Sequence, residues 1–246
     1  MRRIISVSIL LVLGILSCSK KQDTIATPDS MVETVTEMED KGALQGTPVG
    51  EKVLIRTSKG NMTVLLYNET PLHQANFLKL VNDGYYDSLL FHRVIKGFMV
   101  QGGDPKSKGA KSNDRLGSGN VGYTIPAEFN PSLIHKKGAL AAARTNNPKK
   151  ESSGCQYYIV QGKKSTDAEL DRQQLTIQRV NPDFKYTDAQ RETYKSIGGT
   201  PFLDMNYTVF GEVIEGLDVI DKIALEPTAP GDRPLVDIVM SMQVIK

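Results

Sequence analysis

The sequence contains no tryptophan, only two cysteines and only three histidines in 246 residues. The histidines, His73, His92 and His135, are scattered without the spacing of metal ligands, so we predict no metal site. Neither sign of charge dominates, because 30 basic and 28 acidic residues give a net charge of +2. This balance argues against nucleic acid or an acidic surface as a partner.

Long hydrophobic runs are absent apart from residues 4–16, which follow two arginines. This run is too short to span a bilayer comfortably and is typical of a signal peptide. It leads into Ile-Leu-Ser-Cys at residues 15–18, which resembles the lipobox of bacterial lipoproteins. We therefore expect a lipoprotein signal peptide at residues 1–17 and lipidation of Cys18, with the protein anchored to a membrane of the cell envelope and facing the periplasm. The alternative is an ordinary secretory signal followed by a chance cysteine.

The next segment, residues 18–50, is polar, with two prolines and a cluster of acidic residues. This composition predicts a flexible tether to a domain at residues 51–246. Within the domain, Cys155 is the remaining thiol, so no intramolecular disulfide is expected once Cys18 carries lipid. We interpret Cys155 as a small buried side chain rather than a nucleophile.

The most informative stretch is Phe-His-Arg-Val-Ile-Lys-Gly-Phe-Met-Val-Gln-Gly-Gly-Asp at residues 91–104. Apolar and polar residues alternate on both sides of a central glycine, which predicts two short strands and a tight turn. With a three-residue loop, Arg93 would pair with Gln101. Ile95 and Met99 would pair next to the turn, on the same face of the hairpin. That face offers an apolar floor, an amide and a cation with no acid beside it.

The pattern alone leaves two interpretations of this hairpin, an arginine that binds an anion or polarises an amide, or one that is merely solvated. The stretch resembles the signature of the cyclophilins, the peptidyl-prolyl cis-trans isomerases, with Lys96 where a proline is common. Residues 138–145, 153–161 and 201–213 are similar to three further segments of that family. The resemblance covers nearly all of the predicted domain outside residues 163–200 and favours the functional interpretation.

The domain is predicted to be mainly β. The elements expected are a hairpin at residues 53–67, a helix at 70–83, an alanine-rich strand at 138–145, a helix at 216–224 and a strand at 235–245, besides the segments above. We count eight antiparallel strands without strand–helix alternation, which fits a closed eight-stranded barrel capped by two helices. The resemblance implies the same fold.

A helical insertion is predicted at residues 163–200, which a minimal cyclophilin lacks. Two capping boxes mark its helix starts, Thr166 with Glu169 and Thr187 with Gln190. Two interpretations stay open: a lid that buries only its own apolar face, or a contact site for a partner.

The expected mechanism assigns roles to eleven side chains. Arg93 would be catalytic, because a donor aimed at the nitrogen of a twisted amide stabilises that state selectively. Gln101, also placed in the catalytic pair, and Gln156 would orient Arg93 and hold the substrate backbone. The substrate would be bound by Phe98, Met99, Ala143, Arg144, Gln156, Tyr158, Phe202, Leu203 and Tyr207. Three of these depart from the usual family residue: Tyr158 is usually Phe, Phe202 often Trp and Tyr207 in some members His.

We therefore expect a peptidyl-prolyl cis-trans isomerase that acts as a monomer on proline-containing peptides and unfolded proteins of the cell envelope. No metal, organic cofactor or nucleic acid is required. The second interpretation is a chaperone that binds proline-containing segments with little turnover. A hydrolase is poorly supported, because no serine or cysteine stands in a recognisable nucleophile setting beside a histidine.

Overall fold

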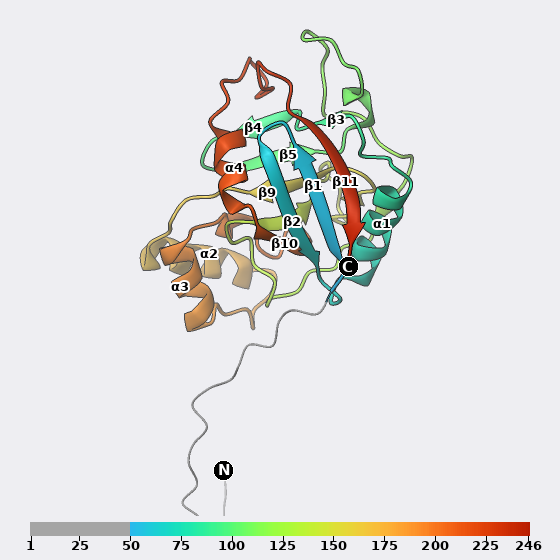
Figure 1. Cartoon of the computed structure of the whole chain (residues 1–246). Helices are drawn as coiled ribbons and strands as arrows, with labels where there is room; N and C mark the ends of the chain where they lie inside the picture. Colours follow the sequence, from blue (N-terminus) through green and yellow to red (C-terminus); the bar gives the residue numbers. More distant parts are fainter. Residues whose placement is uncertain (1–49) are drawn as a thin grey trace, which may run out of the picture. The chain divides into compact units, whose positions relative to one another are not determined.

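The computed structural model describes residues 50–246 (Figure 1). The signal peptide predicted at residues 1–17, the lipidation site Cys18 and the tether up to residue 49 lie outside the described residues. Within residues 50–246, no helix combines the length and the apolar content needed to cross a membrane.

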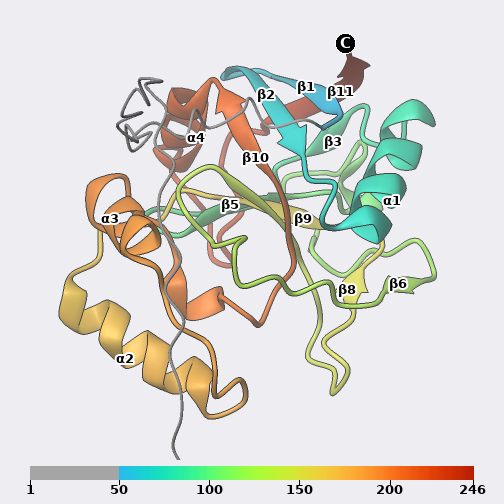
Figure 2. The ribbon, with the colours of Figure 1, turned by 90° about the horizontal axis from the view of Figure 1, so that it is seen from below.

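Nine strands of the described region form one antiparallel sheet that curls around an apolar core (Figure 2). In their order across the sheet, they are β3 (Leu89–Leu90), β11 (Val239–Ile245), β1 (Lys52–Thr57), β2 (Gly60–Leu66), β10 (Val209–Glu215), β7 (Ala139–Ala142), β9 (Tyr157–Val160), β5 (Met99–Gly102) and β4 (Arg93–Ile95). A separate antiparallel pair is made by β6 (Thr124–Ile125) and β8 (Ser152–Ser153).

The sheet is an open half-barrel, so the prediction of a closed eight-stranded barrel is wrong. Among the described residues, the end strands β3 and β4 do not pair with each other. They are only two and three residues long, which is too short to complete a ladder. In addition, Val94 of β4 donates its N–H to the carbonyl of Asp232 at 2.8 Å, so a loop rather than a strand covers that edge.

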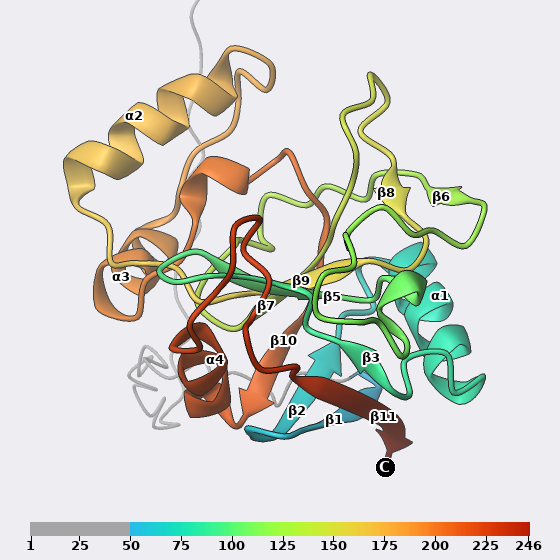
Figure 3. The same cartoon turned by 90° about the horizontal axis from the view of Figure 1, so that it is seen from above.

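The helices α1 (Pro71–Asn82) and α4 (Leu217–Ala224) lie at opposite ends of the curled sheet (Figure 3). Helix α1 begins at Pro71, whose fixed φ suits a first turn, and Gly84 follows its end with a φ of 65°. Both helices bury apolar side chains in the core of the sheet, among them Phe77, Leu80, Ile220 and Ile223. The predictions of a mainly β domain and of these two helices are confirmed.

The hairpin predicted within residues 91–104 is confirmed. Arg93 pairs with Gln101, and Ile95 pairs with Met99 next to the turn. Gly97 has a φ of 76°, which glycine adopts without a steric penalty, and the Phe98 N–H closes the turn on the Ile95 carbonyl at 3.0 Å. The hairpin therefore presents Arg93 and Gln101 side by side.

The insertion forms the two predicted helices, α2 (Asp167–Gln178) and α3 (Asp188–Ser196), and both capping boxes are made. The helices lie to one side of the sheet (Figure 3). The two ends of the insertion are joined by hydrogen bonds of 3.1 and 3.0 Å between the backbones of Lys163 and Gly199. Its apolar side chains form a cluster of their own with two residues from the body. They are Leu170, Ile177, Phe184, Tyr186 and Tyr194, with Ile134 and the partly buried Met205. Short 3-10 turns at Pro105–Ser107 and Pro201–Leu203 complete the fold.

Candidate active site

Nine of the eleven side chains predicted to act on the substrate line a single slot of about 160 Å³. They are Arg93, Phe98, Met99, Gln101, Ala143, Arg144, Tyr158, Leu203 and Tyr207. These residues come from β4, β5 and β9 and from three connecting segments: the turn between β4 and β5, the segment after β7, and the segment that leads through a 3-10 turn into β10. The curl of the sheet brings them together.

The base of the slot is apolar. Met99, Tyr158 and Leu203 are 2%, 5% and 9% exposed, and they pack together in a cluster separate from the main core. The register of the sheet explains the arrangement, because Gln101 of β5 lies opposite Tyr158 of β9. A small apolar ring therefore fits at the base, with polar groups at the rim.

The guanidinium of Arg93 lies at this rim and is oriented by a chain of amides. Its Nη1 donates to Oε1 of Gln101 at 3.4 Å, and Nε2 of Gln101 donates to Oε1 of Gln156 at 3.0 Å. Gln156 in turn donates to the carbonyls of Gly119 at 2.7 Å and Gly117 at 3.1 Å. A backbone loop thus fixes both glutamines, and Gln101 presents its oxygen to the cation.

An acid also holds this cation, although the sequence suggested none beside it. Nε of Arg93 donates to Oδ2 of Asp232 at 3.2 Å. Asp232 has a φ of 66°, unusual for a non-glycine residue, and its carbonyl accepts the Val94 N–H at 2.8 Å. The loop is therefore attached to β4 immediately beside Arg93. The only signal for it in the sequence is the turn composition of Pro230-Gly231-Asp232, which does not indicate a partner.

A larger groove of about 430 Å³ continues from the slot and shares Gln101, Ala143 and Arg144 with it. Gln156 lines this groove rather than the slot. Arg144 is held by its own contacts, since Nε donates to the Asn206 carbonyl at 3.2 Å and the guanidinium lies 4.5 Å from the ring centre of Tyr207. An extended chain could therefore follow the groove and place one residue in the slot.

Phe202 is the second predicted residue that does not line the slot. Its side chain is 51% exposed, and its ring centre lies 5.5 Å from that of Phe98. Phe98 does line the slot, so Phe202 is connected to the slot through its ring contact with Phe98.

Tyr158 directs its hydroxyl away from the slot. The hydroxyl lies 3.0 Å from Nε2 of His135, whose Nδ1 is 2.7 Å from Oδ1 of Asp204. In a neutral ring the proton is therefore assigned to Nδ1, and Nε2 accepts from Tyr158. Burial raises the pKa of Tyr158 well above its ordinary value, which keeps this hydroxyl a donor.

Two buried side chains near the site take no part in the slot. His92 is 3% exposed, neither ring nitrogen has a hydrogen-bond partner among the described residues, and burial lowers its pKa to about 4. Burial raises the pKa of the Cys155 thiol, as expected for a packing residue rather than a nucleophile. Within residues 50–246, no three His, Cys, Asp or Glu side chains gather in the manner of a metal site.

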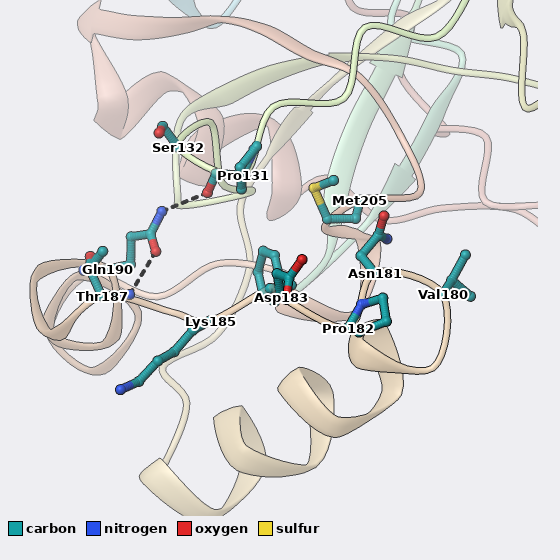
Figure 4. Close-up of a pocket in the computed structure, with 11 residues that line it drawn as sticks. Pro131, Ser132, Val180, Asn181, Pro182, Asp183, Lys185, Thr187, Gln190 and Met205 are labelled. Atoms are coloured by element: carbon teal, nitrogen blue, oxygen red, sulfur yellow. Dashed lines mark hydrogen bonds between the residues drawn. The ribbon is translucent and has the colours of Figure 1, made fainter. Parts of the chain in front are cut away.

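A cavity of about 580 Å³ lies elsewhere, between the insertion and the body (Figure 4). None of the eleven predicted site residues lines it. Its Gln190 is engaged internally, donating to the Pro131 carbonyl at 2.8 Å and accepting the Thr187 N–H at 2.9 Å. This cavity is larger than the slot, but its polar groups do not converge on a common point, so we place the active site at the slot.

The open half-barrel with its slot is the fold of the cyclophilins. A crystal structure of a cyclophilin-type peptidyl-prolyl cis-trans isomerase from Cryptosporidium parvum superimposes with a TM-score of 0.59 at 23% identity, covering 80% of this chain and 99% of that chain. A second structure of that protein, in the presence of the dipeptide Ala-Pro, gives a TM-score of 0.56 at 23% identity over 79% of this chain and 99% of that chain.

The sequence comparisons identify the family. Residues 52–244 match the family model "Cyclophilin type peptidyl-prolyl cis-trans isomerase/CLD". A protein of Staphylococcus aureus (strain COL) that carries the name of a peptidyl-prolyl cis-trans isomerase is 37% identical over 190 residues, which are 77% of this chain and 88% of that protein. The chain therefore belongs to the cyclophilin-type peptidyl-prolyl cis-trans isomerases, and the predicted family and enzyme class are confirmed.

Proposed function

We propose that the chain binds the proline ring of an Xaa-Pro segment in the slot and that Arg93 assists rotation of the preceding peptide bond. The supporting observation is the convergence of nine predicted side chains on one cavity with an apolar base and a cationic rim. The Ala-Pro dipeptide present with the Cryptosporidium parvum protein supports the same class of ligand.

The physical requirement is selective stabilisation of a twisted amide. Rotation about a peptide bond has a barrier of about 18–20 kcal/mol because nitrogen shares its lone pair with the carbonyl. As the bond twists, the nitrogen becomes pyramidal and regains a lone pair that can accept a hydrogen bond. Arg93 donates from Nε to Asp232 and from Nη1 to Gln101. Among the described residues, its Nη2 donates no hydrogen bond. Both N–H groups of Nη2 are thus available to the substrate, and a hydrogen bond from them favours the twisted state over the planar one.

The test is a comparison of the full chain with Arg93→Ala in an exchange NMR assay of proline isomerisation on a short peptide. Removing a donor that acts mainly on the transition state should lower kcat/KM by about 100-fold. The matched control is Arg56→Ala, which removes an exposed arginine that contacts Gln243 on the far side of the sheet from the slot. Equal rates for the wild type and Arg93→Ala would refute the proposal. If the wild type and Arg93→Ala both bind the peptide and neither catalyses its isomerisation, the result supports the chaperone interpretation.

The cellular role extends this proposal. We propose a monomeric enzyme, anchored through lipid at Cys18 and acting on folding proteins of the cell envelope. The support is the run of residues 4–16 and the lipobox-like residues 15–18. Mass analysis of the mature N-terminus checks it: a lipid-modified cysteine at the first position is expected, and Cys18→Ser should move the protein from the membrane to the soluble fraction. An unmodified N-terminus after processing would instead favour the ordinary secretory signal.

A further inference from the structure

The side chain of Asp204 is buried between the body and the insertion. It is 5% exposed, and its two oxygens accept four hydrogen bonds. Oδ1 accepts the backbone N–H of His135 at 2.8 Å and lies 2.7 Å from His135 Nδ1. Oδ2 accepts the hydroxyls of Tyr186 at 2.7 Å and Tyr194 at 2.6 Å. The insertion therefore supplies both donors to one of the two oxygens.

The same carboxylate is linked to the slot. His135, which Asp204 orients, accepts the hydroxyl of Tyr158 at 3.0 Å, and the two rings stack with centroids 6.1 Å apart. Tyr158 lines the slot at its apolar base, and so does Leu203, the residue before Asp204. We refer to these two residues as the wall of the slot. A continuous path of hydrogen bonds thus runs from the insertion to the slot: Tyr186 and Tyr194, then Asp204, then His135, then Tyr158.

The members of this path have little freedom to rearrange. His135, Tyr186 and Tyr194 are each 2% exposed or less, so water does not readily replace a lost partner. Leaving a buried polar group without its partner lowers the stability of the folded protein by about 1–3 kcal/mol, and linked hydrogen bonds strengthen one another. The stem of the insertion is fixed as well, since Thr200 donates its N–H to the His135 carbonyl at 2.8 Å.

We propose that the insertion positions the wall of the proline slot, and that Tyr186 and Tyr194 are positioning residues that act on Tyr158 through Asp204 and His135. This role differs from both interpretations drawn from the sequence, a lid that buries only its own apolar face and a contact site for a partner. It rests on the proposed function only in taking the slot as the place where the proline ring binds.

The first test removes the two hydroxyls alone, in the double variant Tyr186→Phe/Tyr194→Phe of the full chain. Without these donors Asp204 and His135 shift, and the ring of Tyr158 loses its fixed orientation. We expect the Kd of a proline peptide to rise about 3- to 10-fold, which corresponds to about 0.7–1.4 kcal/mol, while kcat changes by less than about twofold. The control for loss of a buried hydroxyl outside the path is Tyr85→Phe, because the Tyr85 hydroxyl has no hydrogen-bond partner among the described residues and its ring packs against Tyr86.

The second readout needs no turnover. In protein with carbon-13 labelled methionine methyl groups, the resonance of Met99 reports on the slot, which Met99 lines. Met240 serves as the internal reference, because its sulfur accepts the Tyr157 hydroxyl in the main core at 3.0 Å. The double variant should shift Met99 and leave Met240 in place. This result stands even if Arg93→Ala shows that the proposed chemistry is wrong.

A double-mutant cycle separates positioning from a loss of stability. In a Tyr158→Phe background the path is already interrupted, so the two insertion substitutions should no longer change the Kd. An equal change in both backgrounds would overturn the proposal, and so would an unchanged Kd and an unchanged Met99 resonance. If the double variant unfolds, the single variants Tyr186→Phe and Tyr194→Phe are compared in the same cycle, each with a smaller expected effect.

Discussion

The two sides of the slot are held in different ways. On the hairpin side, Arg93 is oriented by Asp232 and Gln101 at the surface, and the side chains of Arg93 and Asp232 are each 42% exposed. On the insertion side, Tyr158 is oriented by His135 and Asp204, whose side chains are 1% and 3% exposed. The donor proposed for the amide is thus in contact with solvent, whereas the wall proposed for the proline ring is buried.

This difference gives the two sides different freedom to move: the exposed cation can shift, whereas the buried wall keeps its shape. Exposed ion pairs contribute only about 0–1 kcal/mol, so a cation held by them can shift as the amide rotates. Breaking a buried ionic or hydrogen-bonded group costs about 3–5 kcal/mol, so the wall keeps one shape. The comparison predicts that loss of the buried carboxylate Asp204 mainly lowers stability, whereas loss of the exposed carboxylate Asp232 mainly lowers catalysis.

The largest expected effect is on the insertion side. Asp204→Ala leaves His135, Tyr186 and Tyr194 without their common acceptor, so the free energy of unfolding should fall by about 3 kcal/mol or more. Asp232→Ala, the matched loss of a carboxylate on the exposed side, should lower it by less than about 1 kcal/mol. Urea unfolding of both variants measures the two values. Similar losses would contradict the division between a buried and an exposed side.

An intermediate effect on stability is expected from His92, the buried residue next to Arg93 in the sequence. Its pKa is about 4 in the folded protein against about 6.5 when unfolded, so the unfolded state binds the proton more readily. Stability from this group is therefore complete above pH 6.5 and is lost as the pH falls toward 4. Between pH 7 and pH 5 the loss should be about 2 kcal/mol.

The variant His92→Gln isolates this contribution, because it keeps a polar side chain that does not titrate. Between pH 7 and pH 5, the free energy of unfolding of the wild type should therefore fall by about 2 kcal/mol more than that of the variant. All other ionisable groups are the same in both proteins, so their contributions cancel in the difference. Identical pH dependence of the two proteins would show that His92 is not kept neutral by burial.

The smallest effect is expected from Asp232→Asn, which keeps the shape of the side chain and removes its charge. Arg93 would be held less firmly, and kcat/KM should fall about two- to fivefold, in keeping with an exposed ion pair. Added salt should reduce the wild-type rate toward that of the variant, because screening weakens the same pair. A variant at least as active as the wild type at low salt would mean that Asp232 does not position the cation.

The sequence predicted the hairpin well because its signals are local. Alternation, a central glycine and the pairing of Arg93 with Gln101 all follow from a few adjacent residues. The likeness of four segments to one family, the alanine-rich strand at residues 138–145 among them, then predicted all nine residues that line the slot. Closure of the sheet was predicted wrongly, because strand counting does not show that β3 and β4 are too short to meet.

The supports of the site could not be predicted in the same way. Asp232 lies 139 positions from Arg93, and Asp204 lies 69 positions from His135. A single aspartate or tyrosine in a polar segment carries no sign of its distant partner. Only the packing of the insertion against the body shows that Tyr186 and Tyr194 share an acceptor.

The open sheet has a consequence for the proposed action on unfolded chains. A long free strand edge is a template on which an extended polypeptide aggregates through its backbone. Here one edge, β3, offers two residues, and the other, β4, offers three, with the Val94 N–H already engaged by the Asp232 carbonyl. The proposed binding of a client through one proline side chain would therefore not be extended by pairing of the client backbone with a long strand edge.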